Sequence, residues 1–595
     1  MSEGKKSRSP ARRSSARPQV LMSELREPGQ QAQAPGLTLR SYQVGVLPLV
    51  NRILERIRLE QFLGTYLPAD DPRCQFPTAQ ALLVLVRNVL VSREPVYAVG
   101  AWAAQFAPDL FNLWDEQLAL LHDDRLGRCL TRLFLGTGPE LILAVVRHVI
   151  AEFGVSLDEL HNDSTSVSFY GVYQEASEEG NRQGRATHAI TWGYSKDHRP
   201  DLKQLLYTLT VSRDGGVPVY FTSHSGNVVD DTTHCATWDL LCQLVGSEDF
   251  LYVADCKLAS EENLRHIARK GRFVTVMPRT HGEDEKFRNR LRQSPPTIRW
   301  EPLYDKTNEQ GEVTDRLFVC ADEWLSSGGY RLLWYRSTRK ADLDQETRAR
   351  RVQRALAGLT ELRERLSSPR TRFRERSKVQ QAVDELLAKC EVESLVRVSI
   401  QEGEDAKYRQ AQPGRPSKRT KYKKEVRPRY QLTWELDAAA FENAEREDGI
   451  FPLLTNDRQL TAEEVLRAYK RQPIIEKRFS QLKTDFAVAP VYLKDVGRIQ
   501  GLLAIYFFVL LVQTLLEREL RLAMARKGLE SLPLYPEGRP CSRPTTARVI
   551  ELFEPIQRHW LTVGDSQPQC LVTELTTLQQ QIIQLLGLSP ADYGR

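Results

Sequence analysis

The sequence predicts an α/β protein whose strand-rich core follows a helical domain and is interrupted by a long insertion. Up to about residue 154, apolar residues recur at spacings of three and four, which is the period of a helix. From Ser156 the apolar pattern has a period of two, which is typical of strands. Strands and helices then follow one another until two long charged helical segments intervene. This is the element order of an α/β core.

The composition indicates a globular, soluble chain. Its 595 residues, 41% of them hydrophobic, can bury large cores. The net charge of +6 is small for this length, so the case for an anionic partner depends on local clusters of Lys and Arg. Nine cysteines are scattered without a Cys-x-x-Cys pair, which argues against a zinc site and a disulfide framework.

The sequence shows no export or membrane segment. The first 30 residues lack an apolar stretch. The longest apolar run, Leu502 to Val512, is too short to span a bilayer. We therefore expect a cytoplasmic protein with no membrane partner.

The chain begins with two segments of different character. Residues 1–37 form a disordered basic arm, which either touches nucleic acid phosphates or is a solvated tail. Residues 38–154 are expected to form an all-helical N-terminal domain. Its last helix should begin at Pro139 and end at Gly154.

The first part of the core, residues 155–280, contains two candidate aspartates. Asp163 lies within the first of three strands expected to be antiparallel, and the second and third are joined by an Asp-Gly turn at 213–216. Asp255 ends a later buried strand, at the sheet edge where ligands bind in α/β proteins. The alternative for Asp255 is a cap for the helix that follows.

An insertion domain, residues 281–455, contains a strongly basic stretch. Residues 407–429 carry ten Lys or Arg against one Glu, with tyrosines interleaved. Pro413, Gly414 and Pro416 predict a loop. Such a loop suits phosphate and base contacts, although a solvated loop is an equal alternative. The candidate DNA-binding cations are Lys418, Arg419, Lys421, Lys423 and Lys424.

The second part of the core, residues 456–530, carries the third candidate carboxylate, Glu476. A capping box at 461–464 should start its helix, and Pro473 should kink it. At helical spacing Tyr469, Gln472, Glu476 and Lys483 fall within about 60° of one another on one face. Glu476 could join Asp163 and Asp255 as a ligand of divalent cations, or be a surface residue among cations. Residues 531–595 are expected to be a helical C-terminal segment.

Four motifs together resemble the DDE transposases of bacterial insertion sequences, in the sixteen-thirty-four group of the IS-four superfamily. They are Asn162–Ser166, Gly193–Asp201, Ala254–Ser260 and the stretch from Tyr469 to Lys483. The superfamily signature is Tyr, two residues, Arg, three residues, Glu, six residues and Lys. Tyr469, Glu476 and Lys483 match it, whereas Gln472 stands at the position of the Arg.

The resemblance implies a fold and an activity. The fold is an RNase H-like core, a mixed five-stranded sheet with flanking helices, interrupted after the fifth strand by the large α+β insertion. Asp163, Asp255 and Glu476 would be the catalytic metal-binding triad for two Mg²⁺ ions, with Mn²⁺ as a substitute and no small-molecule cofactor. The protein would bind double-stranded DNA at terminal inverted repeats, cleave it and join the 3′-OH ends to target DNA, as a homodimer at the bacterial nucleoid.

Gln472 leaves one phosphate contact open, since the signature Arg is thought to hold a phosphate. Tyr469 would pack or contact the DNA backbone near a transposon end, and Lys483 could neutralise a bound phosphate near the metals. Two other functions remain open: a metal-dependent nuclease on the same core, and a domesticated DNA-binding protein without catalysis.

Overall fold

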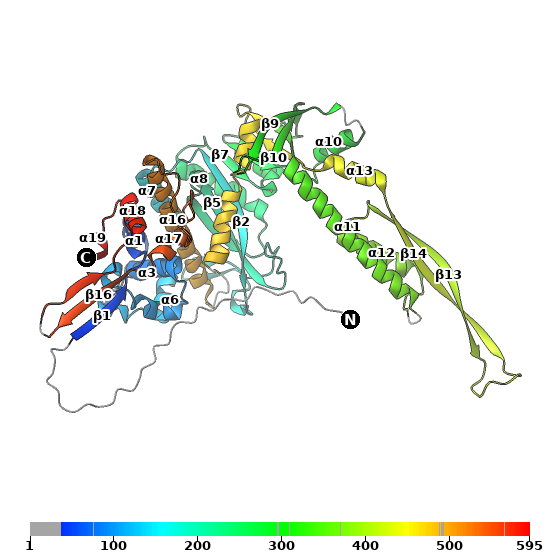
Figure 1. The fold of residues 1–595 in the computed structure, drawn as a ribbon, viewed down its shortest axis with the longest axis horizontal. Helices are drawn as coiled ribbons and strands as arrows, with labels where there is room; N and C mark the ends of the chain where they lie inside the picture. The colour runs from blue at the N-terminus through cyan, green and yellow to red at the C-terminus, as the bar shows by residue number, and fades with distance from the viewer. Residues whose placement is uncertain are drawn as a thin grey trace.

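The computed structural model describes residues 37–594 except 75, 294–296, 309, 369–370, 487, 489–492 and 565. The predicted basic arm therefore lies, apart from residue 37, outside the described residues. Helices account for 46% and strands for 23% of the described residues, which confirms the mixed α/β class. Figure 1 shows a helical body at one end, a large sheet in the middle and a long arm at the other end.

The helical body is built around one buried helix, α16 (Val496–Arg526). Apolar residues surround α16 on nearly all sides, and α1, α3 and α6 pack against it. As predicted, Pro139 stands at the start of α7, and Gly154 ends it in the left-handed conformation with φ 61°. The other helices before the sheet are α1 (Leu47–Ile57), α2 (Leu59–Tyr66), α3 (Thr78–Val91), α4 (Val99–Ala103), α5 (Asp115–Leu118), α6 (Asp123–Gly136) and α7 (Pro139–Phe153).

Helix α16 is longer than its apolar run in the sequence. The run from Leu502 to Val512 is too short to cross a membrane, whereas the whole helix of 31 residues is long and apolar enough to do so. Its most apolar window is 94% buried inside the protein. Among the described residues, only the bent pair α6 and α7 adds a second candidate span. Helix α16 is therefore a buried core helix of the helical body.

A small sheet joins the two ends of the described chain. Strand β1 (Leu37–Gln43) pairs antiparallel with β16 (Gln557–Val563), which pairs with β17 (Gln569–Val572). The expectation of an all-helical N-terminal domain and a helical C-terminal segment is therefore wrong at these strands. The residues of β1 pair with partners more than 500 positions away in β16, so no local pattern indicates β1. The remaining C-terminal helices are α17 (Thr546–Phe553), α18 (Thr577–Leu585) and α19 (Ala591–Gly594).

The central sheet begins with the strands that the sequence predicted. Strand β2 pairs antiparallel with β5, and β5 pairs antiparallel with β6. On its other side β2 pairs parallel with β7, and β7 pairs parallel with β8. Helices α8 (His234–Val245) and α9 (Glu261–Ala268) connect the parallel strands. The strand bounds are β2 (Glu159–Phe169), β5 (Lys203–Ser212), β6 (Pro218–Ser225), β7 (Leu251–Ala254) and β8 (Arg272–Val276), and a separate small hairpin is formed by β3 (Gly180–Arg182) and β4 (Arg185–Thr187).

The sheet is larger than the expected five strands. Its ten strands run in the order β6-β5-β2-β7-β8-β15-β12-β10-β9, with β11 beside β12. Antiparallel pairing of β15 with β8 joins strands of the insertion to the core sheet, because an unpaired edge of β8 would leave backbone groups without partners. The added strands are β9 (Trp300–Thr307), β10 (Val313–Cys320), β11 (Trp324–Leu325), β12 (Arg331–Ser337) and β15 (Ile450–Thr455), with α10 (Gly282–Gln293) and α13 (Ala438–Glu447) nearby.

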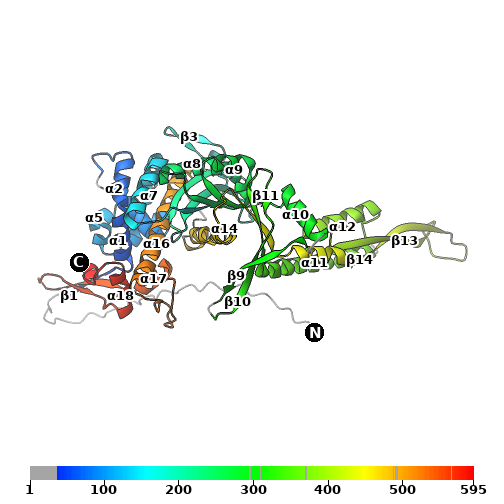
Figure 2. The same cartoon turned by 90° about the horizontal axis from the view of Figure 1, so that it is seen from above.

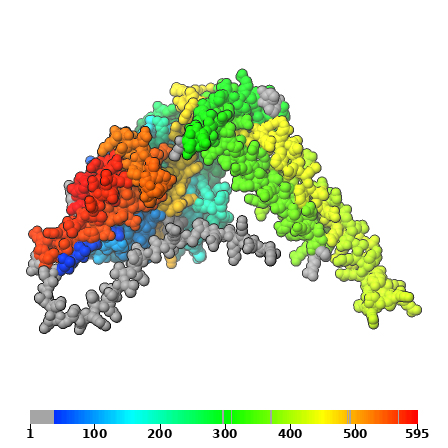
Figure 3. Space-filling model, viewed as in Figure 1, coloured from blue at the N-terminus to red at the C-terminus, as the bar shows by residue number. Residues whose placement is uncertain are grey.

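The arm consists of two helices and a long hairpin. Helices α11 (Thr338–Ser367) and α12 (Arg376–Cys390) share an apolar cluster with the bases of β13 (Val396–Gln410) and β14 (Tyr422–Leu436). This cluster is separate from the core of the sheet. In Figures 1 and 2 the hairpin extends away from the rest of the molecule. The space-filling view shows an arch with the hairpin at one end (Figure 3).

The hairpin corrects the prediction of a loop over residues 407–429. Only residues 411–421 form the connection, and the flanking residues are paired strand, for example Tyr408 with Lys424 and Arg409 with Lys423. Pro413, Gly414 and Pro416 all lie within the connection. These residues therefore indicate where the chain turns, but they do not indicate how long the loop is.

Candidate functional site

Asp163 and Asp255 lie side by side on two neighbouring parallel strands. In the register of β2 and β7, Asn162 is opposite Ala254; Asp163 is the next residue of β2, and Asp255 is the first residue after β7. Neighbouring strands are about 4.8 Å apart, so the two side chains leave the sheet close together. Asp255 also caps the short helix Cys256–Ala259, accepting a hydrogen bond of 3.0 Å from the Lys257 amide. Asp255 therefore stands at the carboxyl end of β7, as one interpretation predicted, and also caps the following helix, as the other predicted.

Burial weakens the acidity of both aspartates. Desolvation raises the pKa of Asp163 to about 6, and the nearby negative charge of Asp255 adds to this rise, while Lys196 opposes it. The pKa of Asp255 is also raised, chiefly by burial, with Asp230 contributing. Both carboxylates are thus held where a positive charge would stabilise their ionised forms.

Lys196 supplies such a charge. Its ammonium lies 3.4 Å from Asp163 Oδ1 and 2.8 Å from Asp230 Oδ2. It also donates hydrogen bonds of 2.7 Å to the carbonyl and to the hydroxyl of Ser164. The Lys196 amide donates to Ser166 Oγ at 3.1 Å, which fixes this loop against β2.

Glu476 projects from α15 (Pro473–Ser480) on an exposed position. Tyr469, at the end of α14 (Ala462–Tyr469), is near enough to Glu476 and to both aspartates for their charges to act on its pKa. The pKa of Tyr469 is raised to about 12, mainly by burial and further by the negative charges of Asp255, Glu476 and Asp163. The charges of the three predicted carboxylates therefore all act on one half-buried tyrosine. In the described ranges, however, no three His, Cys, Asp or Glu side chains are close enough together to form a ready metal site.

The predicted kink at Pro473 is a break between two helices. The capping box of Thr461 and Glu464 starts α14 as expected. This helix ends at Tyr469, and Pro473 begins α15 as its first residue, where its missing N–H costs no helical bond. A π-helical turn at Gln481–Asp485 then follows α15. The four signature positions therefore do not share one continuous helix.

Arg478 attaches α15 to the turn between β5 and β6. Its side chain is 2% exposed and donates hydrogen bonds to the carbonyls of Gly215 at 2.7 Å and Gly216 at 3.0 Å. It also donates to Gln481 Oε1 at 2.7 Å and lies 3.5 Å from Glu517 of α16. This buried network determines where α15 presents Glu476.

Gln472 does not lie on a DNA-accessible face. It is buried, its Oε1 is 3.0 Å from His161 Nδ1, and its Nε2 donates to the Asn162 carbonyl at 3.4 Å. The break before Pro473 turns position 472 toward β2, and the phosphate contact that the signature leaves open at Gln472 stays a prediction. The adjacent Arg471 also faces β2, where it bonds to Glu159.

Lys483 lies in the π-helical turn and forms an ion pair with Asp197. Asp197 belongs to the motif at 193–201 and also lies 3.5 Å from Ser168 Oγ of β2. Lys483 and Lys196 therefore approach β2 from two segments that are almost 300 residues apart in sequence. The structure thus links Lys483 through Asp197 to Ser168 of the aspartate-bearing strand, and its role at a bound phosphate stays a prediction.

The five candidate cations of the insertion lie at and beside the hairpin tip. All five are exposed, and none of them forms an ion pair with another described residue. The ion pairs of the hairpin involve other arginines, Arg409, Arg427 and Arg429. Tyr408 and Tyr422 are also exposed, by 67% and 53%. The tip therefore presents free cations beside aromatic rings. These cations are Lys418, Arg419, Lys421, Lys423 and Lys424.

Sequence reasoning missed Lys196 and Asp230 as members of the site. The motif at 193–201 supported the family resemblance, but no residue in it received a role. Asp230 stands in the short turn Asp230–Thr233 before α8, where acidic residues usually serve as helix caps. Only the folded chain brings this turn beside Lys196.

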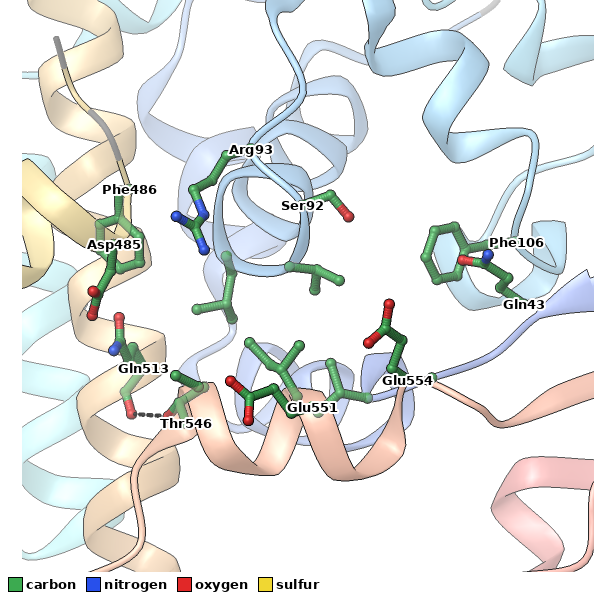
Figure 4. A pocket seen from close by; sticks show the side chains of 16 residues that line it. Gln43, Ser92, Arg93, Phe106, Asp485, Phe486, Gln513, Thr546, Glu551 and Glu554 are labelled. Carbon is green, nitrogen blue, oxygen red and sulfur yellow. Dashed lines mark hydrogen bonds between the residues drawn. The ribbon is translucent and has the colours of Figure 1, made fainter. Parts of the chain in front are cut away.

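A cavity of about 430 Å³ lies away from this site. Figure 4 shows Arg93 directed toward Asp485, with Glu551 of α17 and Glu554, the residue after this helix, on the opposite wall. Thr546 Oγ1 donates to the Gln513 carbonyl at 3.0 Å. None of the predicted catalytic residues lines this cavity.

The fold and site define a mixed α/β protein with paired aspartates on adjacent parallel strands. Comparison of the sequence with protein-family models and with curated proteins finds no match in either set.

Proposed function

We propose that this protein is a DNA transposase of the DDE type, which binds the terminal inverted repeats of an insertion sequence, cleaves the element ends and joins their 3′-OH groups to target DNA. The observation that supports this most is the placement of Asp163 beside Asp255 on neighbouring parallel strands, with Glu476 near enough to act, like the two aspartates, on the pKa of Tyr469. The motifs that resemble this family include all three carboxylates.

The order and direction of five strands support an RNase H-like core. Three antiparallel strands, β6, β5 and β2, are followed across the sheet by β7 and β8, which are parallel to β2. The insertion departs after β8, the fifth of these strands in sequence. This agrees with the interruption that the resemblance implies, and the further strands of the sheet belong to the insertion.

The donor set fits a hard divalent cation in its chemistry. Asp163 and Asp255 are partly desolvated carboxylates, and the positive charge around them is too small to offset the cost of burying their ionised forms. Carboxylate oxygens are ligands that hard divalent cations prefer. Together with Glu476 they would hold Mg²⁺, for which Mn²⁺ can substitute. The bound ions would activate an attacking oxygen and stabilise the leaving oxygen in phosphoryl transfer.

The chain's own residues position the DNA and the third carboxylate. Arg478 anchors α15 to the β5–β6 turn, so that Glu476 is presented from a rigid element. Lys483 would neutralise a phosphate of the bound DNA, in exchange for its ion pair with Asp197. Tyr469 is held in the un-ionised form by burial and would contact the DNA backbone as a hydrogen-bond donor.

Contacts far from the aspartates would supply affinity. The exposed cations of the hairpin tip suit duplex phosphates, and the neighbouring tyrosines suit unstacked bases. The helical body would recognise the terminal repeats, and two copies of the protein would bring both ends together, as the resemblance implies.

Substitution of each carboxylate tests this function. Asp163→Asn, Asp255→Asn and Glu476→Gln keep shape while removing one negative charge, so each should abolish Mg²⁺- or Mn²⁺-dependent cleavage of a labelled transposon end and leave end binding intact. Glu261→Gln serves as a control, because its carboxylate is 83% exposed on the nearby helix α9. Cleavage retained by any triad variant would remove that residue from the site.

Strand joining separates transposition from simple nuclease activity. Wild-type protein with pre-cleaved ends and a supercoiled target should give joined products in Mg²⁺. Cleavage without joining would instead establish a nuclease on this core, and binding without either reaction would establish a DNA-binding protein.

A further inference from the structure

We propose that Lys196 is an internal counter-ion of the candidate metal site and that Asp230 is its anchor, so that this pair sets how strongly the site binds a divalent cation. The proposal rests on the proposed function, because it concerns the same aspartates. It assigns roles to two positioning residues that the sequence motifs left without one.

The distances from the Lys196 ammonium show that Asp230 holds it more closely than Asp163 does. An ammonium group has three N–H donors. Three acceptors lie at short distances from Nζ: Asp230 Oδ2 at 2.8 Å, and the carbonyl and hydroxyl of Ser164, both at 2.7 Å. Asp163 Oδ1 is farther away, at 3.4 Å. Lys196 is thus fully satisfied without Asp163, and it can stay in place when Asp163 turns to bind a cation.

Burial makes these charges interact strongly. The side chains of Lys196, Asp163 and Asp230 are only 24%, 21% and 14% exposed. Asp255 also acts on both Lys196 and Asp163. Screening by water is weak in such surroundings, so one unit of charge changes the affinity for a cation substantially.

The other titratable groups around the pair do not supply a competing cation. His234 is buried and near Asp230, and desolvation lowers its pKa to about 4, which leaves it neutral at pH 7. Its Nδ1 is 3.0 Å from the hydroxyl of Tyr252. Lys257 contributes its backbone amide to Asp255 and acts there only weakly through its charge.

Charge counting then predicts an order of affinities. Asp163, Asp255 and Asp230 with Lys196 give a local charge of −2. Lys196→Gln makes it −3 and should tighten divalent-cation binding. Asp230→Asn makes it −1, frees the ammonium to pair with Asp163, and should weaken binding. The double variant restores −2 and should bind like the wild type.

The test uses Mn²⁺ alone, without DNA, so that its readout is independent of catalysis. Free Mn²⁺ is measured by electron paramagnetic resonance while the full-length protein is titrated, and melting temperature is recorded with and without Mn²⁺. We expect about fivefold or greater tightening for Lys196→Gln and comparable weakening for Asp230→Asn, as one buried charge implies. Lys196→Arg keeps the charge and should stay close to the wild type.

Reference variants separate this inference from the proposed function. If Asp163→Asn and Asp255→Asn fail to weaken Mn²⁺ binding, the metal site itself is wrong, and this inference falls with it. If they weaken binding but Asp230→Asn binds as tightly as the wild type, the metal site stands and the counter-ion role is overturned. Should Lys196→Gln not fold, because it leaves Asp230 unpaired, Asp230→Asn and the double variant still decide the matter.

Discussion

Arg471 donates a hydrogen bond of 2.6 Å to the carboxylate of Glu159, a residue 312 positions earlier in the chain. Glu159 is the first residue of β2, and Arg471 lies in the break between α14 and α15. His161 Nε2 is 2.8 Å from the same carboxylate, and its Nδ1 contacts Gln472. This polar cluster fastens the helix that carries Glu476 to the strand that carries Asp163.

Glu159→Gln should make the protein less stable and remove part of its sensitivity to acid. Burial alone would raise the pKa of Glu159, but hydrogen bonds from His161 and Arg471 outweigh it and lower the pKa from 4.5 to about 2. A lowered pKa stabilises the fold above pH 4.5, and this stability is lost as the pH falls toward 2. We expect a loss of about 2–3 kcal/mol at pH 7.

Denaturant unfolding at pH values from 7 to 2 measures this effect. Asp158→Asn is the matched control, because this neighbouring carboxylate is 75% exposed. If Glu159→Gln unfolds with the same dependence on acid as the wild type, the ion pair does not stabilise the native state.

Gln472→Arg, which restores the family signature, should destabilise the fold instead of improving DNA binding. The side chain of Gln472 is buried beside His161 and Asn162. Arginine has no acceptor to replace Gln472 Oε1 at His161 Nδ1, and it would bring a longer, charged side chain into this buried position. We expect a cost of about 2–4 kcal/mol and no tighter binding of cleaved ends. Ser480→Arg adds the same charge at an exposed position of α15 and controls for electrostatics. Tighter binding by Gln472→Arg alone would mean that this residue turns outward on DNA.

Neutralising the hairpin tip should weaken DNA binding and reduce its dependence on salt. Replacing Lys418, Arg419, Lys421, Lys423 and Lys424 with Gln should lower the slope of log affinity against log salt by up to about 0.9 for each phosphate that the protein no longer neutralises. Fluorescence anisotropy over a range of salt concentrations measures this slope. Arg354→Gln with Lys389→Gln, exposed cations on the two arm helices, is the control. A slope equal to that of the wild type would assign the tip to solvent.

Arg478→Leu should unfold the protein more easily and misplace Glu476. The change leaves Glu517 and two backbone carbonyls without the buried guanidinium, at a cost of about 3–5 kcal/mol. Lys477→Leu, at the exposed neighbouring position, should cost much less. Thermal unfolding compares the two variants, and equal melting temperatures would show that the Arg478 network is dispensable.

Local patterns predicted many elements because their causes are local. The capping box at Thr461, the helix between Pro139 and Gly154 and the hairpin of β5 and β6 all follow from residues within a few positions of one another. Asp163 and Asp255 could be nominated because each stands on a recognisable strand. Their adjacency then follows from parallel pairing of β2 with β7.

Other features depend on partners that are distant in sequence. Strand β1 exists because β16 pairs with it, and the sheet has ten strands because β15 meets β8. Helical spacing predicted that Gln472 and Glu476 share one helix face. In the structure the helix is interrupted before Pro473, and Gln472 points inward to polar groups of β2. A prediction from helical spacing assumes one continuous helix, whereas tertiary packing decides where this helix ends.

By itself the sequence determined the periodicities, the turns, the candidate carboxylates and the basic stretch that became the hairpin tip. The tertiary structure alone decided that Lys196 lies between Asp163 and Asp230, and that Arg471 reaches Glu159 while Gln472 is buried. The physical reason is that periodicity and capping act over a few residues. The pairing of buried charges depends instead on which distant segments exclude water together.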